Sequence, residues 1–530
     1  MPHLPRRPAA RDAARPARYE TRLARALAGR TDPRGVRRLA EEALDRGRAE
    51  DAGHLLGLLP PGLPGLAGTK ARHDRELGRL TESVVGLRRA VTSGRAGAAE
   101  RRQLHRHEDE LRLLSGLRPV LPAAVGPRPE PGTVLHVRAA AAPAPPATSD
   151  RTHAVLAEAA AQGRRVVRAT GGRRRSGPEL ADGVAHHRLG PSRPAPTASG
   201  QLQQQAQALL DLALDVRPAV LHAEGGHADA LVVRAVAEAL GLPWVHQQLG
   251  CPAARWAARR PAAAAGSEVH RLLAARETEA LLAADRALVA DRAAARRLEE
   301  LRPGAAVRTV PVPLDPASPG SPRPVAEARR AVGLPAAVPV LGAVAGPGES
   351  DGVGDLLRAA ALVAAGAPQL LVVVLADGPG ERARLEARAA AHGVLDRLRV
   401  VAGAAPERRL LVLRAVDVLV APLRAPATGP EPPGVAEALA AGTPVVASRL
   451  PALAELVADG ITGMLTPAGD PATLATVLGM LLGSPAVRRC LGDEARRRVL
   501  AERGPAAVAA ALTAAWDELA APAPARGATA

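Results

Sequence analysis

The sequence predicts an α/β protein with two Rossmann-like domains, each a doubly wound parallel sheet, preceded by a helical extension. Short apolar runs alternate with helical segments from residue 133 onward, and the same alternation begins again at residue 338. This rhythm is typical of βαβ units, in which helices cover both faces of a parallel sheet. Residues 21–118 instead carry helical periodicity without strand-like runs, which predicts the extension.

The length and composition are compatible with this architecture. A chain of 530 residues holds about three domain-sized units. Its hydrophobic content of 47% suffices for a core, but the chain has no Phe and one Tyr, so Ala, Leu and Val must fill that core. We expect the three tryptophans, Trp244, Trp256 and Trp516, to fill the core or an interface rather than to stack on a nucleobase.

The chain is strongly basic, with a formal net charge of +17 that comes almost wholly from arginine, since Lys70 is the only lysine. Such a balance favours contact with phosphates, anionic lipid or nucleic acid. Nucleic acid is not the expected partner, because zinc-finger spacing is lacking and a chain without Phe cannot form the aromatic pairs of an RNA-recognition sheet. A composition biased toward Arg and Ala explains the charge without any partner, and we favour that explanation.

Two features predict a cytoplasmic protein. Cys251 and Cys490 are too few and too far apart in sequence for a disulfide framework or a metal site. The first twenty residues carry many arginines and lack the continuous apolar core of a signal peptide. The longest uncharged run, residues 359–376, is divided by Gly366 and Pro368 into a helix and a strand. We therefore expect at most a peripheral contact with anionic membrane, at its inner face.

The N-terminal part begins with residues 1–20, which are rich in Pro, Arg and Ala and are expected to be disordered. The helical extension that follows contains an apolar seam with coiled-coil spacing, formed by Leu77, Leu80, Val84, Leu87 and Val91. After a break at residues 92–97, a second helix is expected to fold back on the first, with Leu104, Leu111, Leu114 and Leu117 on its apolar face. The resulting hairpin is either a docking or dimerisation arm or a helical cap packed on the next domain.

The first Rossmann-like domain is expected at residues 133–315, after a Pro-rich linker at residues 119–132. Its strands are expected at residues 133–137, 165–169, 219–222, 243–246 and 286–290. Helices are expected at residues 151–162, 228–240 and 276–284.

The second Rossmann-like domain is expected at residues 316–510. Its strands are expected at residues 338–344, 370–375, 398–401, 416–420 and 444–447, with helices between them. A last helix begins near residue 505, so that residues 511–530 form its end and a disordered tail.

Residues 431–470 combine a carboxylate-bearing helix start with two strand-loop units. Two prolines break the chain before a run of good helix formers, so a helix begins near Gly434. Gly442 ends that helix, and residues 443–448 then form a short buried strand.

The start of this helix is a candidate binding site. Its unpaired N–H groups make the amides of Gly434 and Val435 candidate phosphate ligands. Glu437 lies in the first turn, where a carboxylate can accept hydrogen bonds from the two hydroxyls of a ribose. Alternatively, Glu437 is a surface glutamate that complements the helix dipole.

Two strings in this region are similar to the donor-site signature of the retaining GT-B glycosyltransferases of family four. They are EALAAGTPVVAS at residues 437–448 and DGITGMLTPAGD at residues 459–470. The first domain resembles the N-terminal domain of exopolysaccharide-type enzymes in that family, through VLHV at 134–137, RTHAVLAEAAAQGRRV at 151–166, LHAE at 221–224, GLPWVHQQLG at 241–250 and ETEALLAADRALVA at 277–290. The resemblance covers residues 133–510 and leaves out the helical extension.

The resemblance implies a GT-B fold with a nucleotide-diphosphate sugar as the donor, bound in the cleft between the two domains. It implies transfer to a glycan, a lipid-linked molecule or another acceptor with retention of anomeric configuration, in a process such as exopolysaccharide biosynthesis. Neither a metal ion nor another cofactor is expected. Glu437 would bind the ribose of the donor, and the amides of Gly434 and Val435 would bind its phosphate.

Further site residues follow from the same resemblance. Glu431 would contact the donor sugar. Gly346 and Asp351 lie in the loop after the first strand of the second domain, and Gly378 follows the second strand, so all three are expected near the nucleotide. His222 matches the first histidine of an HAHS-like string and would contact the sugar or the acceptor; the alternative is a hydrogen-bonded histidine at a strand end.

The sequence departs from the family at several of these positions. The family commonly places an Arg and a Lys where this chain has Gly346 and Asp351, although some exopolysaccharide-type relatives have an acidic residue in place of the Lys. Charge-assisted hydrogen bonds contribute about 1.5–3 kcal/mol each, so two uncompensated losses would slow turnover about 100- to 10,000-fold. Glu431 is displaced by two positions, and the Pro-rich residues 142–150 replace a Gly-rich acceptor loop. The main alternative is therefore a catalytically silent relative that acts as a scaffold or regulator through its helical extension.

Overall fold

The computed structural model describes residues 19–138, 146–172, 176–190, 193–316, 318, 323–346, 350–376, 380–403, 405–425, 432 and 434–520. The chain divides into two compact units. The helical unit comprises Met1–Arg118, Ala195–Gln201 and Pro252–Glu277. The α/β unit comprises Pro119–Pro194, Leu202–Cys251 and Thr278–Ala530.

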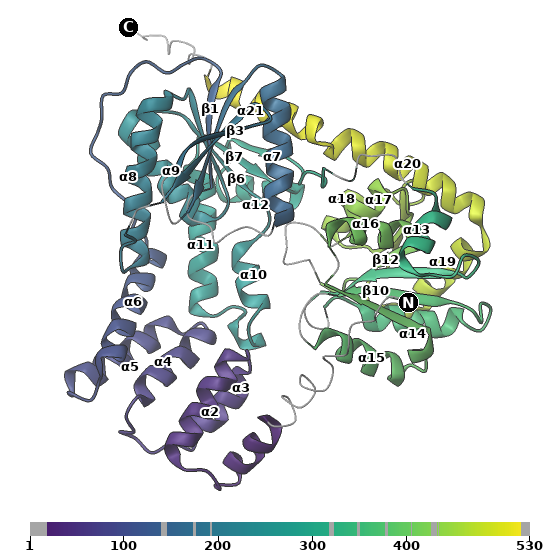
Figure 1. Ribbon diagram of the computed structural model, residues 1–530, viewed down its shortest axis with the longest axis horizontal. Helices are drawn as coiled ribbons and strands as arrows, with labels where there is room; N and C mark the ends of the chain where they lie inside the picture. The colour runs from purple at the N-terminus through teal and green to yellow at the C-terminus, as the bar shows by residue number, and fades with distance from the viewer. Residues whose placement is uncertain are drawn as a thin grey trace, which may run out of the picture. The chain divides into compact units, whose positions relative to one another are not determined.

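The helical unit is built mainly from the short helices drawn in purple and dark blue in Figure 1. After helical residues 19–27, they are α2 (Pro33–Asp45), α3 (Ala49–Gly57), α4 (Leu66–Glu76), α5 (Leu80–Thr92) and α6 (Ala98–Leu114). The unit also includes α10 (Pro252–Ala258), the 3-10 helix Ala262–Ala264 and the first part of α11 (Glu268–Ala283). Tyr19, Leu39 and Leu55 lie in its apolar core.

The predicted hairpin corresponds to α5 and α6, which pack against each other. The prediction was incomplete, because α2, α3 and α4 precede this pair. The predicted seam is also interrupted between α4 and α5, where Gly78 has a φ of 75°. This positive φ turns the chain between the two helices, and glycine adopts it without strain. A side chain at Gly78 would also collide with Ser267.

The extension packs on helices that come much later in the sequence. Leu80 of α5 and Leu114 of α6 share a buried cluster with Val269 of α11. The backbone N–H of Thr81 also donates to Glu268 Oε2 at 2.8 Å. Glu268 and Val269 belong to the same compact unit as the extension, so both interpretations, a docking or dimerisation arm and a cap on the next domain, stay predictions.

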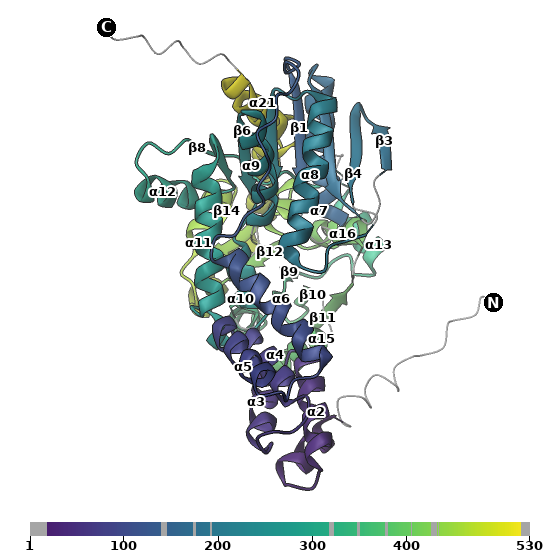
Figure 2. The same ribbon diagram turned by 90° about the vertical axis from the view of Figure 1, so that its left-hand side faces the viewer.

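The first sheet of the α/β unit has eight strands in the order β3-β4-β2-β1-β5-β6-β7-β8. They are β1 (Thr133–Arg138), β2 (Arg165–Gly171), β3 (Ser176–Ala181), β4 (Val184–Leu189), β5 (Val220–Glu224), β6 (Trp244–Gln248), β7 (Arg286–Val289) and β8 (Val307–Thr309). Neighbouring strands are parallel except for β3 and β4, which form the antiparallel edge seen in Figure 2. The helices of this domain are α7 (Pro146–Ala161), α8 (Ala198–Val216), α9 (His227–Leu240) and α12 (Arg292–Leu301).

The strands predicted for the first domain are confirmed. Most of their residues are buried, as expected for strands of a parallel sheet covered on both faces. Leu135 of β1, for example, is paired with Val167 of β2 and Leu221 of β5. The antiparallel edge was not predicted, because SGPELA and VAHHRL contain few apolar residues. Of the two, β3 is the edge strand, and an edge strand needs little apolar character.

The second sheet has six strands, all parallel, in the order β11-β10-β9-β12-β13-β14. They are β9 (Val340–Val344), β10 (Leu371–Ala376), β11 (Leu398–Ala402), β12 (Val418–Ala421), β13 (Val445–Ser448) and β14 (Gly463–Thr466). The first five were predicted. The helices of this domain are α13 (Val325–Val332), α14 (Val353–Val363), α15 (Glu381–Ala391), α16 (Pro406–Ala415), α17 (Val435–Ala440), α18 (Pro451–Leu456), α19 (Pro471–Gly483) and α20 (Pro485–Arg503).

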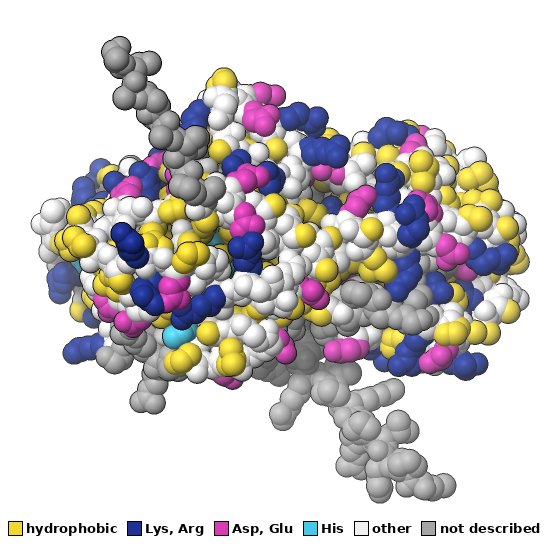
Figure 3. Space-filling model, turned by 90° about the horizontal axis from the view of Figure 1, so that it is seen from above, with side chains coloured by type: hydrophobic (Ala, Val, Ile, Leu, Met, Phe, Trp, Pro, Cys, Tyr) yellow, Lys and Arg dark blue, Asp and Glu magenta, His cyan; other side chains and the backbone are white. Residues whose placement is uncertain are grey.

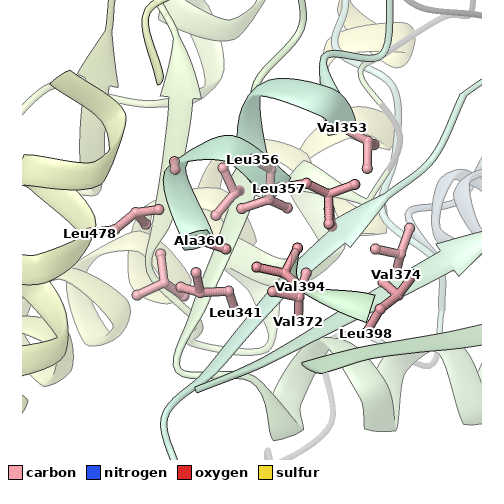
Figure 4. Close-up of a cluster of buried hydrophobic side chains, with 14 of the residues drawn as sticks. Leu341, Val353, Leu356, Leu357, Ala360, Val372, Val374, Val394, Leu398 and Leu478 are labelled. Carbon is pink, nitrogen blue, oxygen red and sulfur yellow. The ribbon is translucent and has the colours of Figure 1, made fainter. Parts of the chain in front are cut away.

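The second sheet has a core on each face. On one face, side chains of α14, α15 and α19 pack on the strands, and Figure 4 shows Leu356 and Leu357 of α14 lying against Leu341 and Val372. On the other face, α16, α17, α18 and α20 cover the strands. Leu, Val and Ala fill both cores, as expected for a chain without Phe.

The last helix, α21 (Pro505–Ala520), begins at the predicted residue and packs on the first sheet. Val508 and Trp516 of α21 share a buried cluster with Val134 of β1 and Leu156 of α7. Within the described residues, no single helix has the length and hydropathy of a membrane span. The segments Pro471–Gly483 and Pro485–Ala520 meet that test only together, as a pair bent by 99°.

Candidate functional site

The second sheet changes winding direction between β9 and β12. The chain runs from β9 to β10 and β11 on one side, and from β12 to β13 and β14 on the other. The carboxyl ends of β9 and β12 therefore lie side by side, and the connections that follow them diverge. Such a switch point is where doubly wound sheets bind ligands.

Glycine allows three backbone segments to meet at this switch point. Gly352 has a φ of 66°, and a Cβ there would collide with the carbonyl oxygen of Pro422 after β12. Gly434, at the start of α17, has a φ of 78°, and its Cβ would lie 2.5 Å from Val344 Cγ2 of β9. The Arg424 N–H donates to the Ser350 carbonyl oxygen at 3.0 Å, which joins the loop after β9 to the segment after β12.

Asp351 lies buried in the loop after β9. Its Oδ1 accepts a hydrogen bond from the Val353 N–H at 3.0 Å. The Arg384 Nη2 of α15 donates both to Asp351 Oδ2 and to the Gly346 carbonyl oxygen, at 3.1 Å in each case. Arg388 Nη1, one turn later on α15, lies 3.6 Å from Asp351 Oδ1. Asp351, at a position where the family commonly has a lysine, thus lies beside two arginines.

Asp355, in the first turn of α14, is the second buried carboxylate near the loop. Arg424 donates to it through Nε at 2.7 Å and through Nη2 at 2.6 Å. Arg358 also pairs with Asp355. The hydrogen bond from Arg424 is the main cause that lowers the pKa of Asp355.

Glu437 lies in α17 at the same edge of the sheet, with 13% of its side chain exposed. Its Oε1 accepts a hydrogen bond from Arg151 Nη2 of α7 at 2.6 Å. The carboxylate expected to bind ribose is therefore already paired with an arginine. The helix α17 is short, with six residues. Its N-cap residue is Gly434, so no side chain caps the first N–H groups of the helix.

A second polar cluster lies at the carboxyl ends of β1 and β5 in the first sheet. Glu224 Oε1 accepts from Thr152 Oγ1 at 3.0 Å, and Glu224 Oε2 lies 3.1 Å from His136 Nε2. Arg138 Nη1 is 3.6 Å from Glu224 Oε1. Burial raises the pKa of Glu224, but the hydrogen bond to His136 and the nearby arginines outweigh burial and bring that pKa to about 2. Glu224 is therefore a buried anion whose charge is balanced by arginine.

His222 is fully buried in β5 beside this cluster. Trp516 Nε1 donates to its Nδ1 at 3.3 Å, and the His136 ring lies 4.8 Å away, edge-on. Burial lowers the pKa of His222 well below its usual value. The geometry is that of a hydrogen-bonded histidine in a strand, which was the alternative interpretation. Contact of His222 with an acceptor stays a prediction. It would require a movement that exposes the His222 side chain, which is now fully buried.

Of the other predicted site residues, Gly346, Asp351, Gly434, Val435 and Glu437 lie together around the switch point. Glu431 and Gly378 lie outside the described residues. So does most of the Pro-rich stretch that replaces the acceptor loop.

Sequence reasoning missed three arginines at this edge: Arg151, Arg384 and Arg424. Their carboxylate partners lie 286, 33 and 69 positions away in the sequence, so spacing gave no signal. The sequence offered one signal: the loop bearing Gly346 and Asp351 lacks the expected cations, which suggests that arginines from elsewhere in the chain lie beside it.

A cavity of about 360 Å³ lies elsewhere in the α/β unit. Thr309 and Pro311 line it from the end of β8, Glu455 from α18, and Arg498 and Glu502 from α20. None of the residues around the switch point lines this cavity. In the part of the chain that the structure describes, no group of three or more His, Cys, Asp or Glu side chains is placed to hold a metal ion.

Known proteins resemble this chain in sequence. Residues 338–484 match the family described as Glycosyl transferases group 1. A D-inositol 3-phosphate glycosyltransferase of Corynebacterium urealyticum is 32% identical over 206 residues, which make up 38% of this chain and 46% of that relative. The chain thus spans about half the length of this curated relative.

Solved structures resemble it in fold. Sucrose-phosphate synthase from Thermosynechococcus elongatus has a TM-score of 0.58 at 22% identity, covering 73% of this chain and 98% of that one. Anabaena HepE, solved in complex with UDP and glucose, has a TM-score of 0.54 at 17% identity, covering 73% and 99%. The chain has the GT-B fold, with two parallel-sheet α/β domains and an added helical region. The predicted fold class and the predicted resemblance are therefore confirmed.

Proposed function

We propose that this chain is a glycosyltransferase that moves a sugar from a nucleotide-diphosphate donor to a glycan, lipid-linked or other acceptor with retention of anomeric configuration. One observation carries the proposal. Glu437 lies at the switch point of the second sheet, inside the segment that matches Glycosyl transferases group 1. Both the place in the fold and the residue type suit the ribose of a nucleotide.

In this proposal the donor lies along the carboxyl edge of the second sheet. Glu437 binds the ribose hydroxyls through Oε2, while Arg151 holds Oε1. The amides of Gly434 and Val435 are assigned to the diphosphate; the Val435 N–H now donates to the Pro432 carbonyl oxygen at 3.5 Å and would exchange that partner for a phosphate oxygen. The loop bearing Gly346 and Asp351 is assigned a place beside the diphosphate, and Gly378 and Glu431 are assigned to the nucleotide and the sugar. These assignments rest on the family resemblance and on the closeness of the described residues to one another.

The reaction breaks the bond between the anomeric carbon and the donor phosphate oxygen. The acceptor hydroxyl oxygen forms its new bond on the face that the diphosphate leaves, and its proton passes to the departing phosphate oxygen. The protein supplies orientation and electrostatic stabilisation of the diphosphate. This scheme needs neither a metal ion nor a cofactor.

The acceptor and the cellular setting are proposed more broadly. A cytoplasmic protein that works on a glycan or lipid-linked acceptor, as in exopolysaccharide biosynthesis, suits the resemblance in the first domain. The net charge of +17 suits a peripheral contact with anionic membrane at the inner face. On the face seen in Figure 3, however, Lys and Arg side chains lie mixed with Asp and Glu.

A catalytically silent scaffold is the alternative, and its support is the missing loop cations at Gly346 and Asp351. The arginines around Asp351 and Asp355 weaken that support, because they place positive charge beside the same loop. The comparisons offer no support for a silent relative.

Isothermal titration of the full chain with UDP-, GDP- and ADP-sugars tests the proposal. We expect one donor to bind, and Glu437→Ala to weaken that binding about 100-fold or more, because the ribose loses two hydrogen bonds to a charged group. Glu407→Ala is the control, since Glu407 is an exposed residue in the first turn of α16. Binding that is unchanged in Glu437→Ala would remove the assignment of Glu437, and silence of the wild type across the panel would favour the scaffold.

A further inference from the structure

The loop after β9 carries no cationic side chain at the two positions where the family binds a diphosphate. Where the family has cations, this chain has Gly346, which carries no side chain, and Asp351, which carries a negative charge. A diphosphate beside an uncompensated carboxylate would be repelled. Donor binding thus requires positive charge from another part of the chain.

The two carboxylates at the loop hold arginines in fixed places. Asp351 is 3% exposed and holds Arg384 on the side of β10, where Arg384 also bonds the Gly346 carbonyl oxygen. Asp355 is 2% exposed and holds Arg424 in a bidentate pair on the side of β12. Arg384, in α15 after β10, and Arg424, in the segment after β12, therefore lie on two sides of the loop.

Several charged side chains form one ionic cluster around the loop: the arginines Arg358, Arg384, Arg388 and Arg424, and the carboxylates Asp351, Asp355 and Glu381. Arg424 has 44% and Arg384 has 23% of its side chain exposed, while Asp351 and Asp355 are buried. Both arginines are therefore partly accessible although each is held by a buried carboxylate.

We propose that Arg384 and Arg424 bind the donor diphosphate in place of the cations that the loop lacks, and that Asp351 and Asp355 position them. This inference rests on the proposed function. Pairing each arginine with a buried carboxylate fixes the planar guanidinium before the ligand arrives, so less side-chain freedom is lost on binding. The acidic residue at a cation position then becomes part of the site rather than a defect in it.

The test compares the binding of nucleoside diphosphates and monophosphates to the full chain. The probes are UDP, GDP and ADP with UMP, GMP and AMP, measured by isothermal titration. For the diphosphate that binds wild type best, Arg424→Gln and Arg384→Gln are each expected to raise the Kd about 10- to 100-fold. Monophosphate binding should change less, so the preference for diphosphate over monophosphate should fall.

Arg358→Gln is the matched control. It removes an ion pair from the same Asp355, but Arg358 lies one turn farther along α14 from the loop. Its diphosphate Kd should stay within about twofold of the wild-type value, because no cation near the ligand is lost. If Arg424→Gln changes the unfolding transition, Arg424→Lys replaces it; lysine keeps the charge without the bidentate geometry, and an intermediate loss is expected.

The outcomes separate this inference from the proposed function. Wild type that binds none of the six nucleotides would overturn the proposed function and this inference together. Wild type that prefers a diphosphate, with the same preference in Arg384→Gln and Arg424→Gln, would overturn this inference alone. A loss in Arg358→Gln as large as in Arg424→Gln would also overturn it, because the effect would then belong to Asp355 and not to the cation at the loop.

Discussion

At the scale of single residues, the switch point depends on positions that admit no side chain. Gly352 has a φ of 66° and touches the carbonyl oxygen of Pro422. An L side chain there would be strained by the backbone angle and would also collide with the neighbouring segment. The loop after β9 and the segment after β12 can approach each other only because of this glycine.

Gly352→Ala is therefore expected to lower the free energy of unfolding of the α/β unit by about 2 kcal/mol or more, measured by urea unfolding of the full chain. Gly354→Ala is the control, because Gly354 lies inside α14 with nothing within 4 Å of an added Cβ. That change should stabilise the protein by up to about 1 kcal/mol. Equal effects of the two substitutions would contradict the close approach described for Gly352.

His246 is the residue whose titration should be visible in stability. Burial lowers its pKa to about 4, from an ordinary value of 6.5. The folded state therefore binds fewer protons than the unfolded state between these two values, so stability is full above pH 6.5 and is lost as the pH falls toward 4. From this residue alone, the free energy of unfolding should be about 2 kcal/mol lower at pH 5 than at pH 7.

Comparing urea unfolding of wild type and His246→Gln at pH 7 and pH 5 checks this expectation. Glutamine does not titrate in this range, so the variant should lose less stability than wild type between the two pH values. The same loss in both proteins would mean that His246 does not carry this pH dependence.

At the scale of elements, the sequence predicted best those strands and helices whose own residues form a clear local pattern. The buried strands β9 and β10 are continuous apolar runs, β1 and β5 are largely apolar, and all four were predicted. The strands β3 and β4, at one end of the first sheet, carry polar residues and were missed. The helical extension was predicted as helical, but its grouping with α10 and α11 was not, because no local pattern reports which distant helix an apolar face will meet.

The site was predictable in the same uneven way. Glu437 and Gly434 lie in one motif, which predicted a helix that begins near Gly434, and α17 begins there; their part in binding stays a prediction. Arg151, Arg384 and Arg424 owe their positions to carboxylates far away in the sequence. Such pairs follow from the folded topology and are not visible in a single sequence.

The contact of the extension with α11 yields a prediction at this scale. Val269 is 1% exposed and packs between Leu80 and Leu114, so Val269→Asp would bury a charge without a partner. We expect it to loosen the helical unit by about 3 kcal/mol or more and to speed protease cleavage within residues 19–118. Arg271→Asp, on the same helix but exposed, should leave cleavage unchanged. A wild-type cleavage rate in Val269→Asp would show that the extension does not depend on α11.

At the scale of the whole molecule, fold and chemistry point the same way. The GT-B fold supplies a switch point, the matched segment supplies Glu437, and the arginines held by Asp351 and Asp355 supply positive charge. The fold alone does not decide the function, since one fold supports several activities. The decision therefore rests on whether this edge of the second sheet binds a nucleotide sugar.

Titration of the full wild-type chain with a panel of UDP-, GDP- and ADP-sugars is the most direct measurement. We expect saturable binding of at least one donor, with a Kd in the usual range of about 1 μM to 1 mM, and loss of that binding in Glu437→Ala. No heat from any donor at about 1 mM, from a chain that unfolds cooperatively, would contradict it.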